Sequence, residues 1–475
     1  MKKSITHLYA LPLTLFMCLV LLLSGFAYQR DELECDQESN INCDQWSNNE
    51  LIIANVNVVD VAKRTIKAGQ NVIIKDGLIA GIEPASSYSN YEAAQIVDAK
   101  GGYLTPGLID MHVHAYDQSA FELSLSHGVT HVRVMNGVKQ HLTWREEQKQ
   151  GWLASSMTVS SPIVRSGEES LPLNWTVNTD EEARAVINTA KHQGYDLIKV
   201  YGSISKPALQ ALLHEAERLN MPVAKHGPHP VNGMEWHSLK GMQSLEHVED
   251  IYQGPLNFKF DQEKLDATIT NLKYADVPVT PTLHIFWQLT QLSQNKQDFL
   301  DGLPRDYISP IIAWEAKGNQ VARWLNSSDN MAKHNQNTLA LLKKITGELH
   351  GNDVPLLVGS DAGVLLSPHG LSTHNELKLM KESGLDSFDV LRAATINPAK
   401  ALKLENRLGQ IKVGLSADLI LSSQNPIENI DVLKSPDAVI KEGRWLSKGD
   451  LQRLRDKAIS TRSWWQEFWV LLTNY

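Results

Sequence analysis

Two histidines separated by one residue, His112 and His114, are the first chemically informative feature of the sequence. They end an apolar run that is typical of a β-strand. Side chains two residues apart on a strand share a face, so both imidazoles would point the same way and could ligate one ion. Of the 17 histidines, all but His7 lie between His112 and His374. Histidine is therefore concentrated in one region of the chain.

Four more polar residues in this region interrupt or close strand-like runs: Lys199, His226, His247 and Asp361. Alternation would turn Lys199 inward, where burial lowers the pKa of an amine. The neutral amine can then react with carbon dioxide to form an anionic carbamate. Taken singly, each of these residues is more often structural, because a buried lysine can pair with a carboxylate or reach solvent along its stem.

Together these residues form a coherent set of metal ligands. Four imidazoles, one carboxylate and a potential carbamate suit two divalent ions of the zinc type. Two such ions can bridge a hydroxide at neutral pH and polarise a carbonyl oxygen, while Asp361 takes a proton and passes it to a leaving amine. The set therefore predicts hydrolysis of an amide or peptide bond.

The elements that would position these residues follow from strand–helix alternation over residues 105–400. Helical spacing is clear at 206–219 and 385–394, between apolar runs such as 130–134 and 354–358. This alternation favours a (β/α)8 barrel, in which catalytic groups gather at the C-terminal ends of the strands. A doubly wound sheet is the alternative, but no glycine-rich phosphate motif follows a predicted strand.

Short β-like runs lie on both sides of the predicted barrel, at 51–104 and 401–448. An Asp76-Gly77 pair separates two of these runs and is typical of a hairpin turn. We expect the two parts to form one composite β-sandwich domain.

The N-terminus has the pattern of a signal peptide or an uncleaved anchor over residues 1–27. Lys2 and Lys3 precede an apolar stretch, and small residues follow it. The pattern predicts an exported, periplasmic or secreted protein, or alternatively one anchored in the membrane by this segment. Residues 28–50 read as a linker whose Cys35 and Cys43 would close a small loop in an oxidising compartment.

Residues 449–475 read as one C-terminal helix that is unusually rich in aromatic residues. Packing onto the body of the protein or onto a second subunit in a homo-oligomer is one interpretation. An interfacial membrane contact is the other.

The net charge and the composition limit the kinds of molecule that the protein is expected to bind. Lys plus Arg is 45 and Asp plus Glu is 54, so the net charge is 45 − 54 = −9. A protein that binds nucleic acid by neutralising phosphates is normally basic, so we expect no nucleic-acid partner. With 42% hydrophobic and 21% charged residues, neither a disordered chain nor a polytopic membrane protein is expected. The partner that remains is a small-molecule or dipeptide substrate.

The motif residues quoted above resemble those of the amidohydrolase superfamily, and more narrowly its imidazolonepropionase- and prolidase-like branch. The resemblance extends from 51 to 445 and includes 106–114, 196–201, Glu246-His247, 281–283 and 391–399. It implies that His112, His114 and Asp361 bind one metal ion and that His226 and His247 bind a second. It also implies that carboxylated Lys199 bridges the two ions, and that Asp361 is the general base and acid.

The substrate is less well defined by the sequence. Six residues are candidates for substrate binding: Tyr201, Arg165, His229, His284, His369 and His374. Arg165 could hold a substrate carboxylate through two hydrogen bonds, as a dipeptide requires, or could pair with a neighbouring acid. The leading interpretation is an Xaa-Pro dipeptidase. The alternatives are an imidazolonepropionase-like hydrolase of cyclic amides, a metal-dependent enzyme with a non-hydrolytic reaction, and a catalytically inactive, membrane-tethered binding protein.

Overall fold

A computed structural model describes residues 50–87, 95–168, 173–318 and 320–473. The predicted signal peptide or anchor at 1–27 and the cysteine-containing linker, up to residue 49, lie outside the described residues. In the part of the chain that is described, no helix is both long and apolar enough to cross a bilayer.

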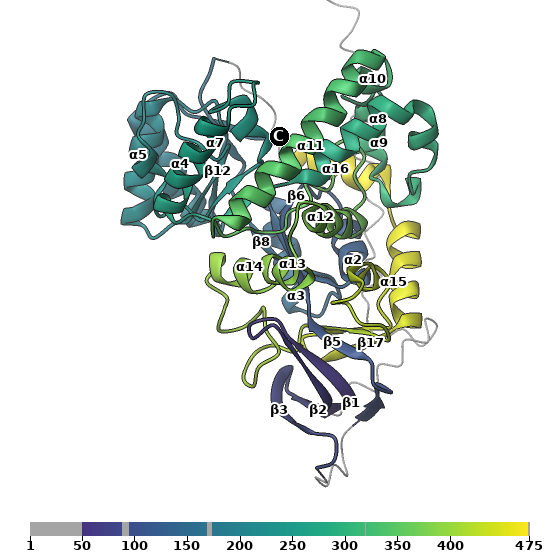
Figure 1. The fold of residues 1–475 in the computed structure, drawn as a ribbon. Coiled ribbons are helices and arrows are strands. Elements are labelled where there is room, and N and C mark those ends of the chain that lie inside the picture. The colour runs from purple at the N-terminus through teal and green to yellow at the C-terminus, as the bar shows by residue number, and fades with distance from the viewer. Residues whose placement is uncertain (1–49, 88–94, 169–172, 319, 474–475) are drawn as a thin grey trace, which may run out of the picture. The chain divides into compact units, whose positions relative to one another are not determined.

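The main element is a set of parallel strands. Its strands are β6 (Leu108–Val113), β7 (Val129–Val134), β8 (Ser156–Val159), β11 (Ile198–Val200), β12 (Val223–His226), β13 (Ser244–Glu246) and β14 (Val279–Thr280). Of these, β6, β8 and β12 are labelled in Figure 1. A parallel bridge from Ser160 to Leu197 joins β8 to β11. The extended segment 354–362 pairs with β14 on one side and, through Ala362 and Val113, with β6 on the other. The ring is thus closed, and the predicted (β/α)8 barrel is confirmed.

Two short strands, β9 (Ile163–Arg165) and β10 (Asn174–Thr176), extend the sheet beside β11. The helices that follow the strands are α2 (Ser119–Ser126), α3 (Lys139–Lys149), α4 (Asp180–Gln193), α5 (Lys206–Arg218), α6 (Glu249–Gln253), α7 (Gln262–Ala275), α8 (Leu283–Asp301), α9 (Pro310–Gly318), α10 (Gln320–Leu325), α11 (Asp329–Gly351), α12 (Leu371–Glu382), α13 (Ser387–Ala394) and α14 (Ile396–Ala401). Single 3-10 turns are η2 (Trp236–Leu239), η3 (Arg305–Tyr307) and η4 (Ile430–Lys434). The helices expected at 206–219 and 385–394 are therefore present as α5 and α13.

A second sheet combines strands from both sides of the barrel sequence. It contains β1 (Glu50–Asp60), β2 (Thr65–Lys75), β3 (Leu78–Pro84), β4 (Gln95–Asp98), β5 (Tyr103–Pro106), β15 (Leu419–Ser422), β16 (Ala438–Lys441) and β17 (Arg444–Ser447). β15 pairs with β5, which joins the late strands to the early ones. The hairpin turn at Asp76-Gly77 is confirmed: both residues have positive φ, as a two-residue hairpin turn requires.

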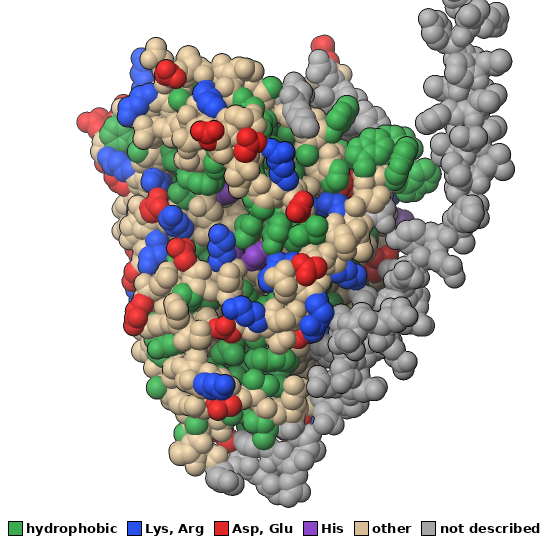
Figure 2. Space-filling view, turned by 90° about the vertical axis from the view of Figure 1, so that its right-hand side faces the viewer, with side chains coloured by type: hydrophobic (Ala, Val, Ile, Leu, Met, Phe, Trp, Pro, Cys, Tyr) green, Lys and Arg blue, Asp and Glu red, His purple; other side chains and the backbone are tan. Residues whose placement is uncertain are grey.

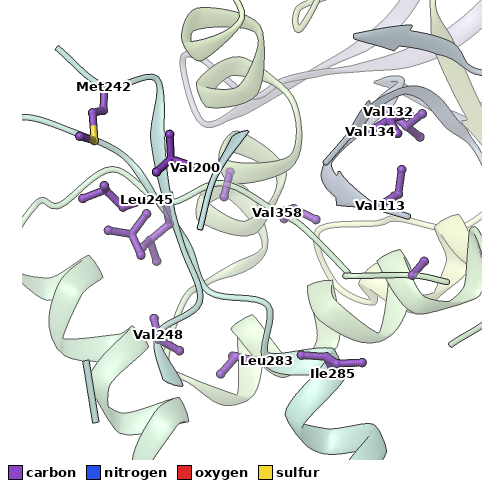
Figure 3. Close-up of a cluster of buried hydrophobic side chains, with 14 of the residues drawn as sticks. Val113, Val132, Val134, Val200, Met242, Leu245, Val248, Leu283, Ile285 and Val358 are labelled. Carbon is purple, nitrogen blue, oxygen red and sulfur yellow. The ribbon is translucent and has the colours of Figure 1, made fainter. Parts of the chain in front are cut away.

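The barrel strands pack against the helices through branched aliphatic side chains (Figure 3). In β6, Met111 and Val113 are buried in the hydrophobic core, and they alternate with the two histidines. The predicted inward phase of His112 and His114 follows from this alternation. The core that contains Val113 also holds Val134, Val200 and Val358 of other barrel segments, so the site residues stand on well-packed strands.

The prediction of one continuous C-terminal helix over 449–475 is wrong. The chain forms two helices, α15 (Lys448–Ser460) and α16 (Trp464–Thr473). Between them Arg462 turns inward, and its Nε donates to Asp117 Oδ2 at 2.8 Å. This buried ion pair fixes the segment between the two helices.

Candidate metal centre and active site

The end of β6 and the end of the segment 354–362 bring three ligand-type side chains together. His114 Nε2 lies 3.1 Å from Asp361 Oδ1, and His112 Nε2 lies 3.7 Å from the same oxygen. Their ligand atoms are all within 4.8 Å of one another. A Cβ at Gly363, where φ is +94°, would clash with the carbonyl oxygen of His114, so this turn requires glycine beside the cluster.

Two further histidines continue this cluster. The ring of His247, just after β13, lies 4.7 Å from that of His112, measured between centroids. The ring of His226, at the end of β12, lies 4.4 Å from that of His247. The four imidazoles predicted from sequence therefore form one continuous row across the ends of β6, β12 and β13.

Three of these rings have one nitrogen engaged by a second group. His112 Nδ1 contacts Glu246 Oε2 at 2.8 Å, His226 Nε2 contacts Asp250 Oδ2 at 3.0 Å, and His247 Nδ1 contacts Thr282 Oγ1 at 2.7 Å. The other nitrogen of each ring is left for a different partner. Histidines that bind metals usually have this arrangement, because the outer contact fixes the ring and its tautomer.

Burial lowers the pKa of both His112 and His247 well below the usual histidine value. Both rings are therefore neutral at physiological pH. Neutral imidazole is the form that donates a lone pair to a metal ion.

Glu246 is itself held by a fully buried polar network beneath the histidines. Arg133 Nη2 donates to Glu246 Oε1 at 2.8 Å, and Ser244 Oγ donates to the same oxygen. Arg133 also donates through Nε to Met111 O at 2.7 Å. Burial alone would raise the pKa of Glu246, but the positive charge of Arg133 opposes this effect and keeps the pKa below the usual glutamate value, so the carboxyl remains ionised.

Two buried lysines, Lys199 and Lys225, lie on the neighbouring strands β11 and β12 and differ in their hydrogen bonds. Burial lowers the pKa of both Lys199 and Lys225 to about 8. Lys225 Nζ donates to His226 O and Gly227 O, each at 2.9 Å. Lys199 Nζ has no hydrogen-bond partner among the described residues. An unpartnered buried amine is costly as an ammonium ion, which favours the neutral and reactive form.

Asp361 is the acidic member of the cluster. Burial would raise its pKa, but the contact with His114 opposes this effect, and the pKa lies below the usual aspartate value. Its Oδ1 is buried without a hydrogen-bond donor of good geometry among the described residues. Asp361 also has a φ of 55°, in the left-handed region that few residues other than glycine adopt. Such backbone strain is often found at functional sites.

These observations fit a divalent metal centre. Four imidazole rings, an ionised carboxylate and an orphaned buried amine provide the nitrogen and oxygen ligands that zinc-type ions prefer. His112, His114 and Asp361 would hold one ion, His226 and His247 another, and Lys199 as a carbamate would link them.

The structure places the six substrate candidates differently. The ring of Tyr201 lies 4.3 Å from that of His226. Arg165 is half-buried, and its positive charge partly offsets the rise in pKa that burial causes at Tyr201. It forms no ion pair among the described residues. His284 is buried, its Nδ1 contacts Asn375 Nδ2 at 2.9 Å, and its Nε2 is unpartnered. These three lie in or beside the metal cluster.

The other three candidates have different surroundings. His369 lines a small cavity next to His114. His229 lies beyond β12 and its Nδ1 contacts Pro230 O at 2.9 Å. His374 is apart from the cluster: its Nε2 contacts His127 O at 2.7 Å, so it ties α12 to the end of α2.

Sequence reasoning missed the groups that hold the histidines, namely Arg133, Asp250 and Thr282, and it assigned no role to Glu246. A signal existed for Arg133, because a charged residue at an inward position of an apolar strand needs a buried partner. Thr282 lies in the 281–283 motif, to which sequence reasoning assigned no role. No comparable signal existed for Asp250, whose contact depends on the loop after β13.

Comparison with known proteins decides the family. The model of the amidohydrolase family matches residues 103–446, which is most of the chain. The chain belongs to the amidohydrolase family. The predicted resemblance to this superfamily is therefore confirmed, and members of the family are hydrolases that typically bind metal ions.

Individual amidohydrolases resemble this one over most of its length. The imidazolonepropionase of Psychrobacter cryohalolentis is 26% identical over 375 residues, 73% of this chain and 81% of that protein. Bottromycin amidohydrolase superposes with a TM-score of 0.72 at 24% identity, covering 87% of this chain and 91% of the other. A Xaa-Pro dipeptidase superposes with a TM-score of 0.64 at 20% identity, covering 84% and 100%.

Some relatives match over short stretches only. Against bacterial adenine deaminases, including that of Rhizobium johnstonii, the chain covers between 11% and 21% of their length. The fold is shared with all the solved structures named above, whereas their substrates differ.

Proposed function

We propose that this amidohydrolase cleaves the amide bond of a small substrate that carries a free carboxylate, and that an Xaa-Pro dipeptide is its substrate class. The assignment as a hydrolase rests on the row of four imidazoles next to Asp361. In three of these imidazoles one ring nitrogen contacts a second polar side chain, which fixes the ring. Such a row can hold metal in one geometry. An Xaa-Pro dipeptidase with the same fold supports the choice of substrate.

When bound, divalent ions would lower the pKa of a water molecule and polarise the substrate carbonyl. Asp361 is ionised at neutral pH, because its contact with His114 keeps its pKa below the usual aspartate value despite burial. Its carboxylate can therefore accept the proton of the attacking water and deliver it to the leaving nitrogen. The polar contacts behind His112, His226 and His247 keep the rings in place during these steps.

Arg165 supports a carboxylate-bearing substrate. It is the half-buried guanidinium near Tyr201, and the described residues provide it with no acid. A guanidinium without a partner can form two parallel hydrogen bonds to a carboxylate. Removing such contacts to a charged group costs about 1.5–3 kcal/mol, which corresponds to a rise in KM of about 10- to 100-fold.

A second candidate function is hydrolysis of a cyclic amide. It rests on the similarity to the imidazolonepropionase of Psychrobacter cryohalolentis, which extends over 73% of this chain. An imidazolone ring presents its scissile bond within the ring, whereas a dipeptide presents a linear bond next to a terminal carboxylate.

A substrate panel separates the two functions. Zinc-loaded protein would be assayed with Xaa-Pro dipeptides, with the same dipeptides as C-terminal amides, and with ring amides. We expect turnover of the free dipeptides, and Arg165→Gln should raise KM for them but not for the amidated forms. Turnover of ring amides alone would replace the dipeptidase proposal, and no turnover by the metal-loaded protein would revive the binding-protein alternative.

We further propose export of the enzyme, on the basis of the basic and apolar pattern in residues 1–27. Fractionation of cells that express the full chain, with N-terminal sequencing of the product, tests this proposal. A cytoplasmic product that retains Met1 would refute it.

A further inference from the structure

The C-terminal helix α16 buries its acidic side chain and exposes its aromatic side chains. On this helix the acidic residue Glu467 is 1% exposed and Val470 is 9% exposed. The large apolar side chains face away from the protein: Trp464 is 40% exposed, Trp465 65%, Phe468 38%, Trp469 56% and Leu472 55%. Their spacing of one, three and four residues places them on one face of the helix. A helix of a soluble protein normally buries such a face.

Specific polar contacts hold α16 in this orientation. Glu467 Oε2 accepts a hydrogen bond from Ile311 N at 3.0 Å and another from Ser309 Oγ, both at the start of α9. On the N-terminal side of the helix, Arg462 is paired with Asp117 at 2.8 Å. Glu467 within the helix and Arg462 before it both hold the polar side of α16 against the protein, so these contacts determine that the aromatic face points outward.

The neighbouring helix α9 enlarges this face. It contacts α16 and contributes Trp314, which is 71% exposed. We call Trp314, Trp464, Trp465, Phe468, Trp469 and Leu472 the aromatic patch. None of the six is charged. Figure 2 views the side of the molecule that carries α9 and α10, and hydrophobic side chains gather on the upper part of this face.

We propose that the aromatic patch docks onto the surface of a lipid bilayer. Four of its six residues are tryptophan, whose ring has an apolar body and one polar N–H and concentrates at the membrane–water interface. An uncharged aromatic helix face of this kind inserts to the depth of the headgroups without spanning the bilayer.

The area of the patch favours a bilayer over a second copy of the chain. A fully covered aromatic side chain buries about 150–250 Å². At 38–71% exposure, the six side chains offer roughly 100 Å² each and about 600 Å² together. A stable protein–protein interface needs about 800 Å² from each partner. A bilayer has no such minimum, because each inserted side chain contributes separately.

The N-terminal sequence places a bilayer within reach. Residues 8–28 are uncharged and form the predicted signal or anchor segment, and residues 29–49 separate it from the first described strand. A linker of 21 residues can span up to about 70 Å when extended. If the segment anchors the protein, the patch can reach the same membrane from any position on the body.

The proposal can be tested with the full chain and vesicles made of equal parts phosphatidylcholine and phosphatidylglycerol, with bromine atoms on the acyl chains. Bromine quenches tryptophan that enters the bilayer. Four of the 12 tryptophans belong to the patch, so we expect quenching of up to about a third of the emission (4/12). The double variant Trp465→Ser/Trp469→Ser should lose most of this quenching.

A matched control removes two exposed aromatic residues elsewhere. Phe258 is 58% exposed and Tyr274 is 70% exposed, and neither belongs to the patch. Phe258→Ser/Tyr274→Ser should be quenched like the unmodified chain, and both variants should retain its circular dichroism spectrum. Equal quenching in the two double variants would overturn the proposal. So would a dimer in solution that Trp465→Ser/Trp469→Ser disperses while brominated vesicles leave the emission unchanged.

Discussion

Replacing Glu246 by glutamine should separate the two roles of the buried network beneath the metal site. The substitution keeps size and one oxygen acceptor but removes the negative charge that faces Arg133 at 2.8 Å and His112 at 2.8 Å. The guanidinium of Arg133 would remain fully buried with only neutral acceptors. Removing one partner of a buried ion pair costs about 3–5 kcal/mol. Because Arg133 keeps its contacts to Met111 O and Ser244 Oγ, we expect about 3 kcal/mol.

The second effect of Glu246→Gln concerns the metal. The carboxylate orients the ring of His112 and increases its basicity, and loss of such an outer contact lowers metal affinity about 10- to 100-fold. Urea unfolding of the metal-free proteins measures the first effect, and competition with a chromophoric chelator measures the second.

A buried ion pair in the other sheet provides the control. Lys441 Nζ lies 2.9 Å from Asp418 Oδ1, and both side chains are buried there. Asp418→Asn should also destabilise the metal-free protein, by less than Glu246→Gln because Lys441 keeps Glu442 Oε1 at 3.2 Å, and should leave the metal affinity unchanged. Our reasoning is refuted if Glu246→Gln binds metal as tightly as the unmodified protein. It is also refuted if Asp418→Asn lowers the affinity equally.

Three further predictions concern single residues. Lys199→Ala should lose activity and one of two metal ions, measured by elemental mass spectrometry, and short carboxylic acids should restore part of the activity; full activity would exclude a bridging role. Asp361→Asn should fold but lose about 100- to 10,000-fold in kcat, and near-normal turnover would remove Asp361 from the mechanism. Burial and the nearby Asp117 raise the pKa of Glu467 to about 7, above the ordinary value of 4.5. Its contribution to docking of α16 is therefore fully present below about pH 4.5 and is lost as the pH rises through 7. Hydrogen exchange of the α16 amides, relative to their intrinsic rates, should accelerate as the pH rises from about 4.5 to 7 and level off above 7 in the unmodified chain, but not in Glu467→Gln.

The barrel and its row of ligands could be predicted from two features of the sequence: the alternation of side chains along a strand and the position of each ligand at a strand end. Alternation in β6 determines that His112 and His114 share a face, and every parallel strand of a barrel delivers its last residue to the same rim. His226, His247 and Asp361 therefore meet without any knowledge of the loops. Alternation along its strand likewise predicts that Lys199 faces the interior.

Contacts that depend on loop closure could not be predicted. Thr282 reaches His247 only because the chain turns through a left-handed conformation at Thr282, with φ of 53°, before α8 begins. His374 has the same residue type as the ligands, yet it lies on α12 and contacts His127 O. Residue type and region identify candidates, but the side of the barrel on which a helix residue lies is set by packing.

Two buried atoms link metal binding to the stability of the fold. Lys199 Nζ and Asp361 Oδ1 both lack a hydrogen-bond partner of good geometry among the described residues. Each unpartnered group costs free energy, and the neighbouring Lys225, with two carbonyl acceptors, shows that this barrel can satisfy a buried ammonium when it needs one. The fold therefore has an unfavourable free-energy contribution at the position where the predicted ligands meet. A divalent ion coordinated there would supply a partner for Asp361, and carboxylation of Lys199 would convert its amine into an anionic carbamate able to act as a ligand. The folded state would gain that binding free energy and the unfolded chain would not, so a metal ion bound at this site would also stabilise the barrel.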